Sequence, residues 1–217
     1  MVRNTMEEKY KYLGYLLILL VPITFLAFYK TYFVQFPNFK DNITTYTHLH
    51  AFISIIWILI LITQPVLIVK GKKKIHRAIG KITYLLFPLL ILSFIPLVFS
   101  MYHSEHQKAV FFPLADGILL ILFYSLAIYN KKNVSVHMRF MIGTALIFLG
   151  PTIGRIGPSI LGLSHEVTQN MSYVINYIIL IGLIFYDRKI KIRSQVYLLL
   201  VGVWVVHQIA FNLIFWW

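Results

Sequence analysis

The chain has 217 residues, a formal net charge of +13 and a hydrophobic share of 59%, while only 12% of its residues are charged. This balance is typical of a polytopic membrane protein and leaves no room for a separate soluble domain. The chain has no cysteine, which excludes disulfides, thiolate metal sites, iron–sulfur clusters and thioether-attached haem. Its basic residues lie in short loops between apolar runs, which argues against nucleic acid as a partner.

Seven apolar runs follow one another along the chain, and a helix needs about 20 apolar residues to cross a bilayer. The predicted spans lie near residues 12–33, 50–69, 79–101, 109–129, 137–158, 171–186 and 196–215. The first run is too long for a signal-peptide core and lacks a small-x-small cleavage site, so it is predicted to be an uncleaved span. The expected fold class is all-α: a polytopic membrane helix bundle of about seven transmembrane helices, in a single domain covering residues 1–217.

Prolines and glycines predict irregular helices in two of these spans. Pro22 is expected to kink the first span. Gly150-Pro151 and Gly157-Pro158 are expected to break the fifth helix. The fifth span also carries glycines on one stripe, the close-approach surface that membrane helices use for packing: Gly143, Gly150, Gly154 and Gly157.

The distribution of lysine and arginine predicts how the bundle is oriented. Three bases precede or begin the first span, six lie from Lys70 to Lys81, three from Lys131 to Arg139, and four from Arg188 to Arg193. These sixteen of the twenty bases fall on one side of the seven spans, which by the positive-inside rule is the cytoplasm. We therefore expect the amino terminus inside and the carboxyl terminus outside.

The polar residues of the second span share one helical stripe. They recur at a spacing of three or four residues among otherwise aliphatic positions: His50, Ser54, Trp57, Leu61 and Gln64. This stripe is expected to face the bundle interior. His48 lies roughly 200° around the helix from His50, at 100° per residue, so it is expected at the membrane interface.

Asp116 is the only carboxylate inside a predicted span. A charge at that depth is unfavourable by several kcal/mol unless it is paired, which makes Asp116 a functional-site hypothesis. Candidate partners at a similar height are Arg155, His50 and His207, and a buried pair that only fixes helix register is an equally open alternative. The predicted outward polar cavity comprises Asp116, Arg155, Gln64, Asn176 and Asn212, with Gln208 alongside.

Two sets of histidines suggest cofactor sites at the two membrane faces. His76 and His137 open the third and fifth spans at matching depth, each close to an arginine. Bis-histidine haem needs two imidazoles at equal depth on facing helices, a condition that His76 with His137 meets inside, and His50 with His207 or His106 outside. These histidines are therefore candidate ligands of haem b. Contact with lipid headgroups is the alternative role of the inner pair.

His103 and His106, at i and i+3 beside Glu105, form a weaker candidate site. Imidazole and carboxylate suit a divalent metal. A solvated loop is the alternative.

The chain resembles a group of small, uncharacterised bacterial multi-pass membrane proteins over residues 46–158. Their pattern is a His opening a span that ends in Gln, then His-Arg-x-x-Gly, then His-x-Arg-x-Met, then Pro followed by Gly-Arg. Here it is carried by His50 with Gln64, His76-Arg77 with Gly80, His137-Met138-Arg139-Phe140-Met141, and Pro151 with Gly154-Arg155. The histidine placement is also similar to that of cytochrome b561-type proteins, which hold haem b between paired histidines, although no b561 signature is present.

Three function classes fit these residues. The first is a haem- or metal-binding membrane redox protein that uses histidines at both faces. The second is a carrier or sensor of a small solute or protons, with Asp116, Arg155 and His50 along the pathway, and the third is an assembly or scaffold protein. Soluble-enzyme motifs such as a Gly-rich phosphate loop or His-Glu-x-x-His are absent. The expected location is the cell (inner) membrane, with the lipid bilayer as partner and a second copy or another membrane protein left open.

Overall fold

The structure, a computed structural model, describes residues 10–40, 43–105, 107–193 and 195–216. Within these ranges the chain is helical and contains no strand. Six helices are long and apolar enough to cross a membrane, and Gly14–Tyr29 forms a shorter apolar helix. The predicted all-α, polytopic membrane fold is therefore confirmed, and the protein is an integral membrane protein.

The chain divides into two compact units, a first unit of Met1–Gly117 and a second unit of Ile118–Trp217. The boundary falls within helix α7 (Phe111–Tyr129). That residues 1–217 act as a single domain stays a prediction.

The first span is built from three consecutive helical pieces, α2 (Lys11–Leu16), η1 (Leu17–Leu19) and α3 (Leu20–Tyr29). The 3-10 turn η1 contains Ile18, whose carbonyl would pair with the missing N–H of Pro22. The irregularity expected from Pro22 thus lies in the turn before it. Gly14 lets α2 approach α4, because a Cβ at this position would come 2.8 Å from the Cβ of Pro65.

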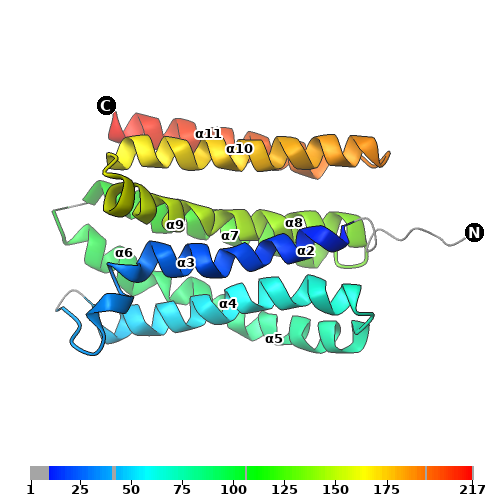
Figure 1. Cartoon of the computed structure of the whole chain (residues 1–217), viewed down its shortest axis with the longest axis horizontal. Helices are drawn as coiled ribbons and strands as arrows, with labels where there is room; N and C mark the ends of the chain where they lie inside the picture. Colours follow the sequence, from blue (N-terminus) through cyan, green and yellow to red (C-terminus); the bar gives the residue numbers. More distant parts are fainter. Residues whose placement is uncertain (1–9, 41–42, 106, 194, 217) are drawn as a thin grey trace, which may run out of the picture. The chain divides into compact units, whose positions relative to one another are not determined.

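The second and third spans form the rest of the first unit. Helix α4 (Thr45–Val69) packs along α5 (Lys73–Leu92), and α6 (Phe94–Tyr102) continues α5 after Ser93 (Figure 1). Pro96 explains the interruption, because its missing N–H leaves the carbonyl of Leu92, the last residue of α5, without its helical partner. Gly71 closes the α4–α5 turn at a φ of 70°, a conformation that favours glycine.

The second unit contains the rest of α7 and the last three spans. The fifth span comprises α8 (Val134–Ile147), α9 (Leu149–Ile156) and the π-helix η4 (Gly157–Leu161), followed by α10 (His165–Lys189) and α11 (Gln195–Phe215). The predicted break in the fifth helix is confirmed, since α8 ends four residues before Pro151 and a π-helix replaces the α-helix at Gly157-Pro158. A Cβ at Gly143 would lie 3.1 Å from side-chain atoms of Phe123 and Leu200, whereas a Cβ at Gly154 would meet nothing within 4 Å. Gly143 therefore serves close packing as predicted, and Gly154 does not.

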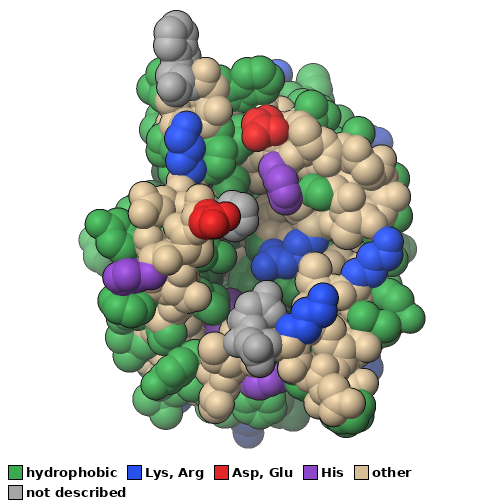
Figure 2. All heavy atoms as spheres, turned by 90° about the vertical axis from the view of Figure 1, so that its left-hand side faces the viewer, with side chains coloured by type: hydrophobic (Ala, Val, Ile, Leu, Met, Phe, Trp, Pro, Cys, Tyr) green, Lys and Arg blue, Asp and Glu red, His purple; other side chains and the backbone are tan. Residues whose placement is uncertain are grey.

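Several helices exceed their predicted bounds. Helix α4 begins five residues before His50, α5 begins six residues before Ile79, and α10 begins six residues before Met171. Figure 2 shows one end of the helices, with charged side chains and histidines beside hydrophobic ones, and many large apolar residues along the spans are exposed. Exposed apolar helix surface of this kind is what a lipid environment accommodates.

Candidate functional site

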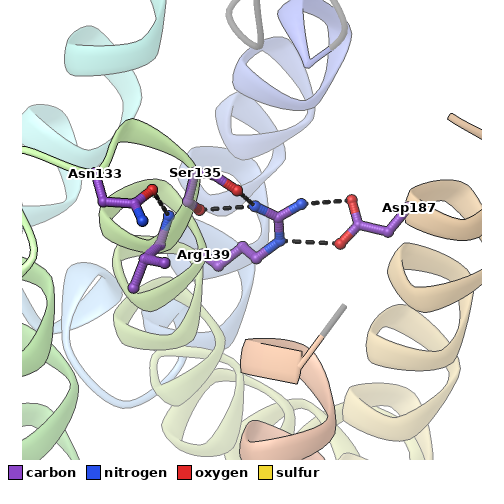
Figure 3. A network of polar contacts seen from close by, with 5 residues as sticks. Asn133, Ser135, Arg139 and Asp187 are labelled. Carbon is purple, nitrogen blue, oxygen red and sulfur yellow. Dashed lines mark hydrogen bonds and ion pairs between the residues drawn. The ribbon is translucent and has the colours of Figure 1, made fainter. Parts of the chain in front are cut away.

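A buried ion pair joins α8 to α10 in the second unit. Arg139 is 1% exposed and Asp187 is 0% exposed. The guanidinium donates from Nε to Oδ2 at 2.9 Å and from Nη2 to Oδ1 at 2.6 Å, a bidentate arrangement (Figure 3). Its Nη1 donates to the carbonyl and the hydroxyl of Ser135, one turn earlier in α8. The Tyr197 ring of α11 lies 5.2 Å from Cζ, so three helices meet at this charge.

The location of this pair differs from the sequence interpretation. Arg139 was expected at the inner start of the fifth span, and Asp187 was expected just past the sixth span. Helix α10 instead continues to Lys189, and both charges are enclosed. The statement that Asp116 is the only carboxylate within a span is therefore wrong, because α10 also contains Glu166 in its first turn and Asp187 near its end.

A second set of polar side chains links α10 and α11 towards the other end of this unit. Gln208 Nε2 donates to Asn170 Oδ1 at 2.8 Å, and Tyr177 donates to Gln208 Oε1 at 2.8 Å. Asn170 Nδ2 donates to Asn212 Oδ1 at 3.3 Å. The structure thus brings the predicted cavity residue Asn212 together with Gln208. A groove of about 500 Å³ opens beside Asn170 and Asn212.

Asn176, the other amide of the predicted cavity, is fully buried near the middle of the 25-residue helix α10. Neither its oxygen nor its nitrogen has a hydrogen-bond partner among the described residues. Ser172, one turn away on the same face, and Trp204 Nε1 share this property within the described ranges. The Tyr173–His207 pair sets the antiparallel register of α10 and α11. In this register Asn176, three residues after Tyr173, lies level with Trp204, three residues before His207. Buried polar groups without partners therefore gather at mid-helix.

The two candidate haem ligands of the second unit occupy different depths. His207 lies in mid-helix, where Tyr173 contacts its Nδ1 at 2.8 Å. His137 lies in the first turn of α8 and donates from Nδ1 to the carbonyl of Ala127 at 2.8 Å. These two histidines cannot bind one iron because of that difference. The pairs His76 with His137 and His50 with His207 each take one member from each unit, and His106, the alternative partner of His50, lies outside the described residues, so all three pairings stay predictions.

The predicted stripe of α4 faces the interior of the first unit, with Trp57 and Leu61 buried. His50 Nδ1 lies 2.8 Å from Ser93 Oγ, and its Nε2 lies 3.4 Å from Ser54 Oγ. At the other end of the helix, His76 Nδ1 lies 3.4 Å from the carbonyl of Gln64. Gln64 and His76 are therefore neighbours, although the sequence assigned them to different sites.

The predicted metal site at His103 and His106 gains no support. His103 is exposed and donates from Nδ1 to the carbonyl of Phe99 at 2.9 Å. His106 lies outside the described residues. The described ranges contain no group of three histidine, aspartate or glutamate side chains that could hold a metal.

Asp116 and Arg155, the proposed charge pair of the cavity, belong to different units. Asp116 is half-buried in the first unit. Arg155 is half-buried in α9 and donates from Nη1 to the carbonyl of Pro151 at 3.0 Å. Their pairing stays a prediction. No family model matches the chain, and neither a curated protein nor a solved structure matches it.

Proposed function

We propose that the protein carries protons or a small polar solute across the cell membrane through the polar interior of its second unit. The observation that carries this proposal is the Asn176 amide, fully buried at mid-helix without a partner among the described residues. Native proteins satisfy nearly all such groups with protein, water or ligand. A space that holds water or solute at this depth accounts for Asn176, and carriers bind their substrates near the bilayer midplane.

Groups on both sides of Asn176 support a pathway. Towards the predicted outer face, the Tyr173–His207 pair leads to the amides of Asn170 and Asn212 and their groove. Ionisable and hydrogen-bonding side chains that face a bundle interior commonly mark ion and proton routes.

Towards the predicted inner face, the buried aliphatic residues Leu180, Ile184 and Leu200 separate Asn176 from the Arg139–Asp187 pair. A layer of aliphatic side chains next to a charged pair would block water and solute in the closed state. A pathway that opens to one side at a time needs such a barrier.

Proteoliposomes test the proposal with Asn176→Leu, which keeps the side-chain volume but removes the amide. Vesicles with a pH-sensitive dye inside report proton flux, and swelling in glycerol or urea reports solute flux. We expect the parent protein to exceed protein-free vesicles in one of these assays and Asn176→Leu to lose most of that flux. The variant should keep or raise its melting temperature, because a buried unsatisfied amide is destabilising.

Ile178→Leu is the matched control, because Ile178 lies on the same helix and is 65% exposed. It should retain the parent flux. Equal flux in the parent and in Asn176→Leu, or no flux above protein-free vesicles for either proton or solute, would contradict the proposal. The scaffold role would then be favoured, with a second copy or another membrane protein as partner.

A second candidate function, haem b binding, is favoured by the inner histidines. His76 and His137 each occupy the fourth residue of a helix and direct Nδ1 at a backbone carbonyl. A carbonyl only accepts, so the neutral imidazole holds its proton on Nδ1 and its lone pair on Nε2, the arrangement of a metal-ligating histidine. The purified protein should then show a Soret band that His137→Ala abolishes and that the exposed control His165→Ala keeps. A colourless protein from haem-replete cells would eliminate this candidate.

A further inference from the structure

The end of α3, the segment that follows it up to Phe39, and His48 of α4 line a hollow of about 710 Å³ in the first unit. This volume lies in the range of small-molecule sites. Aromatic rings form most of the wall: Phe25, Tyr29, Tyr32, Phe33, Phe36 and Phe39. None of the lining residues is acidic or basic apart from His48. The hollow is therefore an aromatic site with one titratable imidazole.

The rings hold one another in place. Phe25 lies 4.9 Å from Phe33 between ring centroids, Tyr32 lies 5.3 Å from Phe39, and Phe39 lies 4.6 Å from the His48 ring in an edge arrangement. Aromatic pairs at these separations attract one another beyond the effect of their burial. Phe36, in contrast, is 76% exposed, so the wall is open to a ligand on that side.

A hydrogen bond fixes the polar character of the site. The hydroxyl of Tyr32 lies 2.6 Å from His48 Nδ1. In one tautomer the phenol donates to Nδ1 and the imidazole carries its own proton on Nε2. Among the described residues, this Nε2–H has no hydrogen-bond partner, so it is a donor left for a ligand.

We propose that this hollow binds the head group of a lipophilic quinone. A flat neutral ring matches aromatic walls, and a quinone carbonyl can accept the hydrogen bond that His48 Nε2 offers. A quinone also reaches the site from the bilayer, because the hollow lies where two membrane helices end and begin. Two other occupants fit less well. A quaternary ammonium would find no acidic side chain among the described residues that line the hollow and would face an N–H donor, while a lipid acyl chain would leave that donor unused.

All residues that line this site belong to the first unit, whereas the proposed transport path belongs to the second, so quinone binding and transport can fail independently. The test uses the full chain in nanodiscs of phosphatidylglycerol, titrated with a benzoquinone that carries a decyl chain. Intrinsic fluorescence measures binding, and empty nanodiscs correct for partitioning into lipid. We expect saturable binding with one quinone per chain.

Variants at His48 separate hydrogen bonding from simple packing. His48→Phe keeps a ring but removes the donor, and its dissociation constant should rise about three- to tenfold, the range of one hydrogen bond. His48→Gln restores an N–H donor and should recover most of the affinity. His103→Phe, at an exposed histidine outside the hollow, should bind like the parent protein. Melting temperatures establish that each variant is folded.

Three results would overturn the proposal. Quinone uptake that matches empty nanodiscs would mean that no site exists. Equal affinity of the parent and His48→Phe would assign the hollow to an acyl chain. A third result would assign the hollow to a quaternary ammonium: a second quinone does not displace the bound quinone and His48→Phe does not weaken its binding, whereas a phosphocholine detergent displaces it at low concentration.

Discussion

A buried arginine inside a membrane helix is tolerated only with a close counter-charge, and Asp187 supplies it for Arg139. Removing one member of such a pair leaves the other charge uncompensated, which destabilises more than removing both. The desolvation of each ion offsets much of the attraction between them. The pair therefore contributes more to fixing how α8 and α10 pack against each other than to the stability of the fold.

Asp187→Leu should accordingly lower the free energy of unfolding by roughly 3–5 kcal/mol. Asp187→Asn should cost less, because its amide oxygen still accepts from Arg139. The double variant Arg139→Leu/Asp187→Leu should be more stable than Asp187→Leu alone, since no charge is left buried. Chemical unfolding in detergent micelles measures all three. A single Asp187→Leu variant as stable as the parent protein would show that Arg139 does not depend on this carboxylate.

The burial of Asp187 could have been predicted from the sequence, because it continues the spacing of Tyr173, Asn176, Leu180 and Ile184 by three residues. All five side chains are buried in α10. The run Asp187-Arg188-Lys189 instead resembles a charged loop, and a limit drawn at the last apolar residue misses the final turn. Asn176 was predicted to line an outward polar cavity; its side chain is buried in α10, and the cavity stays a prediction. That its amide has no partner among the described residues depends on how the surrounding side chains pack, which the sequence around Asn176 does not show.

Helix limits were harder to predict than helix positions, and α10 shows why. Its first turn is polar, with Ser164 as the N-cap whose hydroxyl accepts from the amide of Val167. Thr168 and Gln169 then face the interior of the second unit and are buried. High hydropathy identifies the helical turns that face lipid. A helical turn that buries polar side chains against protein has low hydropathy, so the sequence alone predicts a loop there. Proline, in contrast, acts locally, which is why the broken fifth helix was predictable.

The junction between η4 and α10 depends on the absence of a side chain at Gly157. A Cβ there would overlap the Thr168 side chain and lie 2.8 Å from its Cβ. Thr168 is fully buried and donates to the carbonyl of Ser164 at 2.7 Å, so it has little room to move. Gly157→Ala should therefore lower the free energy of unfolding by about 1–3 kcal/mol, as overpacked cores do.

Gly154→Ala is the matched control for this element, because its Cβ would meet nothing within 4 Å. It should be neutral or slightly stabilising, since alanine favours the helix over glycine. Adding Thr168→Ala to Gly157→Ala should restore part of the lost stability. If both glycine variants melt at the same temperature, close approach of η4 and α10 is not required.

At the scale of the whole molecule, sixteen of the twenty bases predict the orientation of the chain in the membrane. A reporter enzyme that works only outside the cytoplasm should be active when it is fused after Trp217. A reporter that works only inside should be active when it is inserted between Lys70 and Lys73. Substituting the six bases of Lys70–Lys81 by glutamine should weaken this preference. Cytoplasmic activity of the fusion after Trp217 would refute a seven-span arrangement.

The first unit combines helices of very unequal length. At 1.5 Å per residue, Gly14–Tyr29 is roughly 24 Å long and Lys73–Tyr102 roughly 45 Å, against about 30 Å of hydrocarbon. The bilayer must thin beside the short helix, while the long one must tilt or protrude. Its first three turns carry Lys73, Lys74, Arg77 and Lys81, all exposed. This end of α5 therefore presents a cluster of bases to the lipid phosphates. Each base contributes about 1 kcal/mol to the binding free energy of anionic lipid.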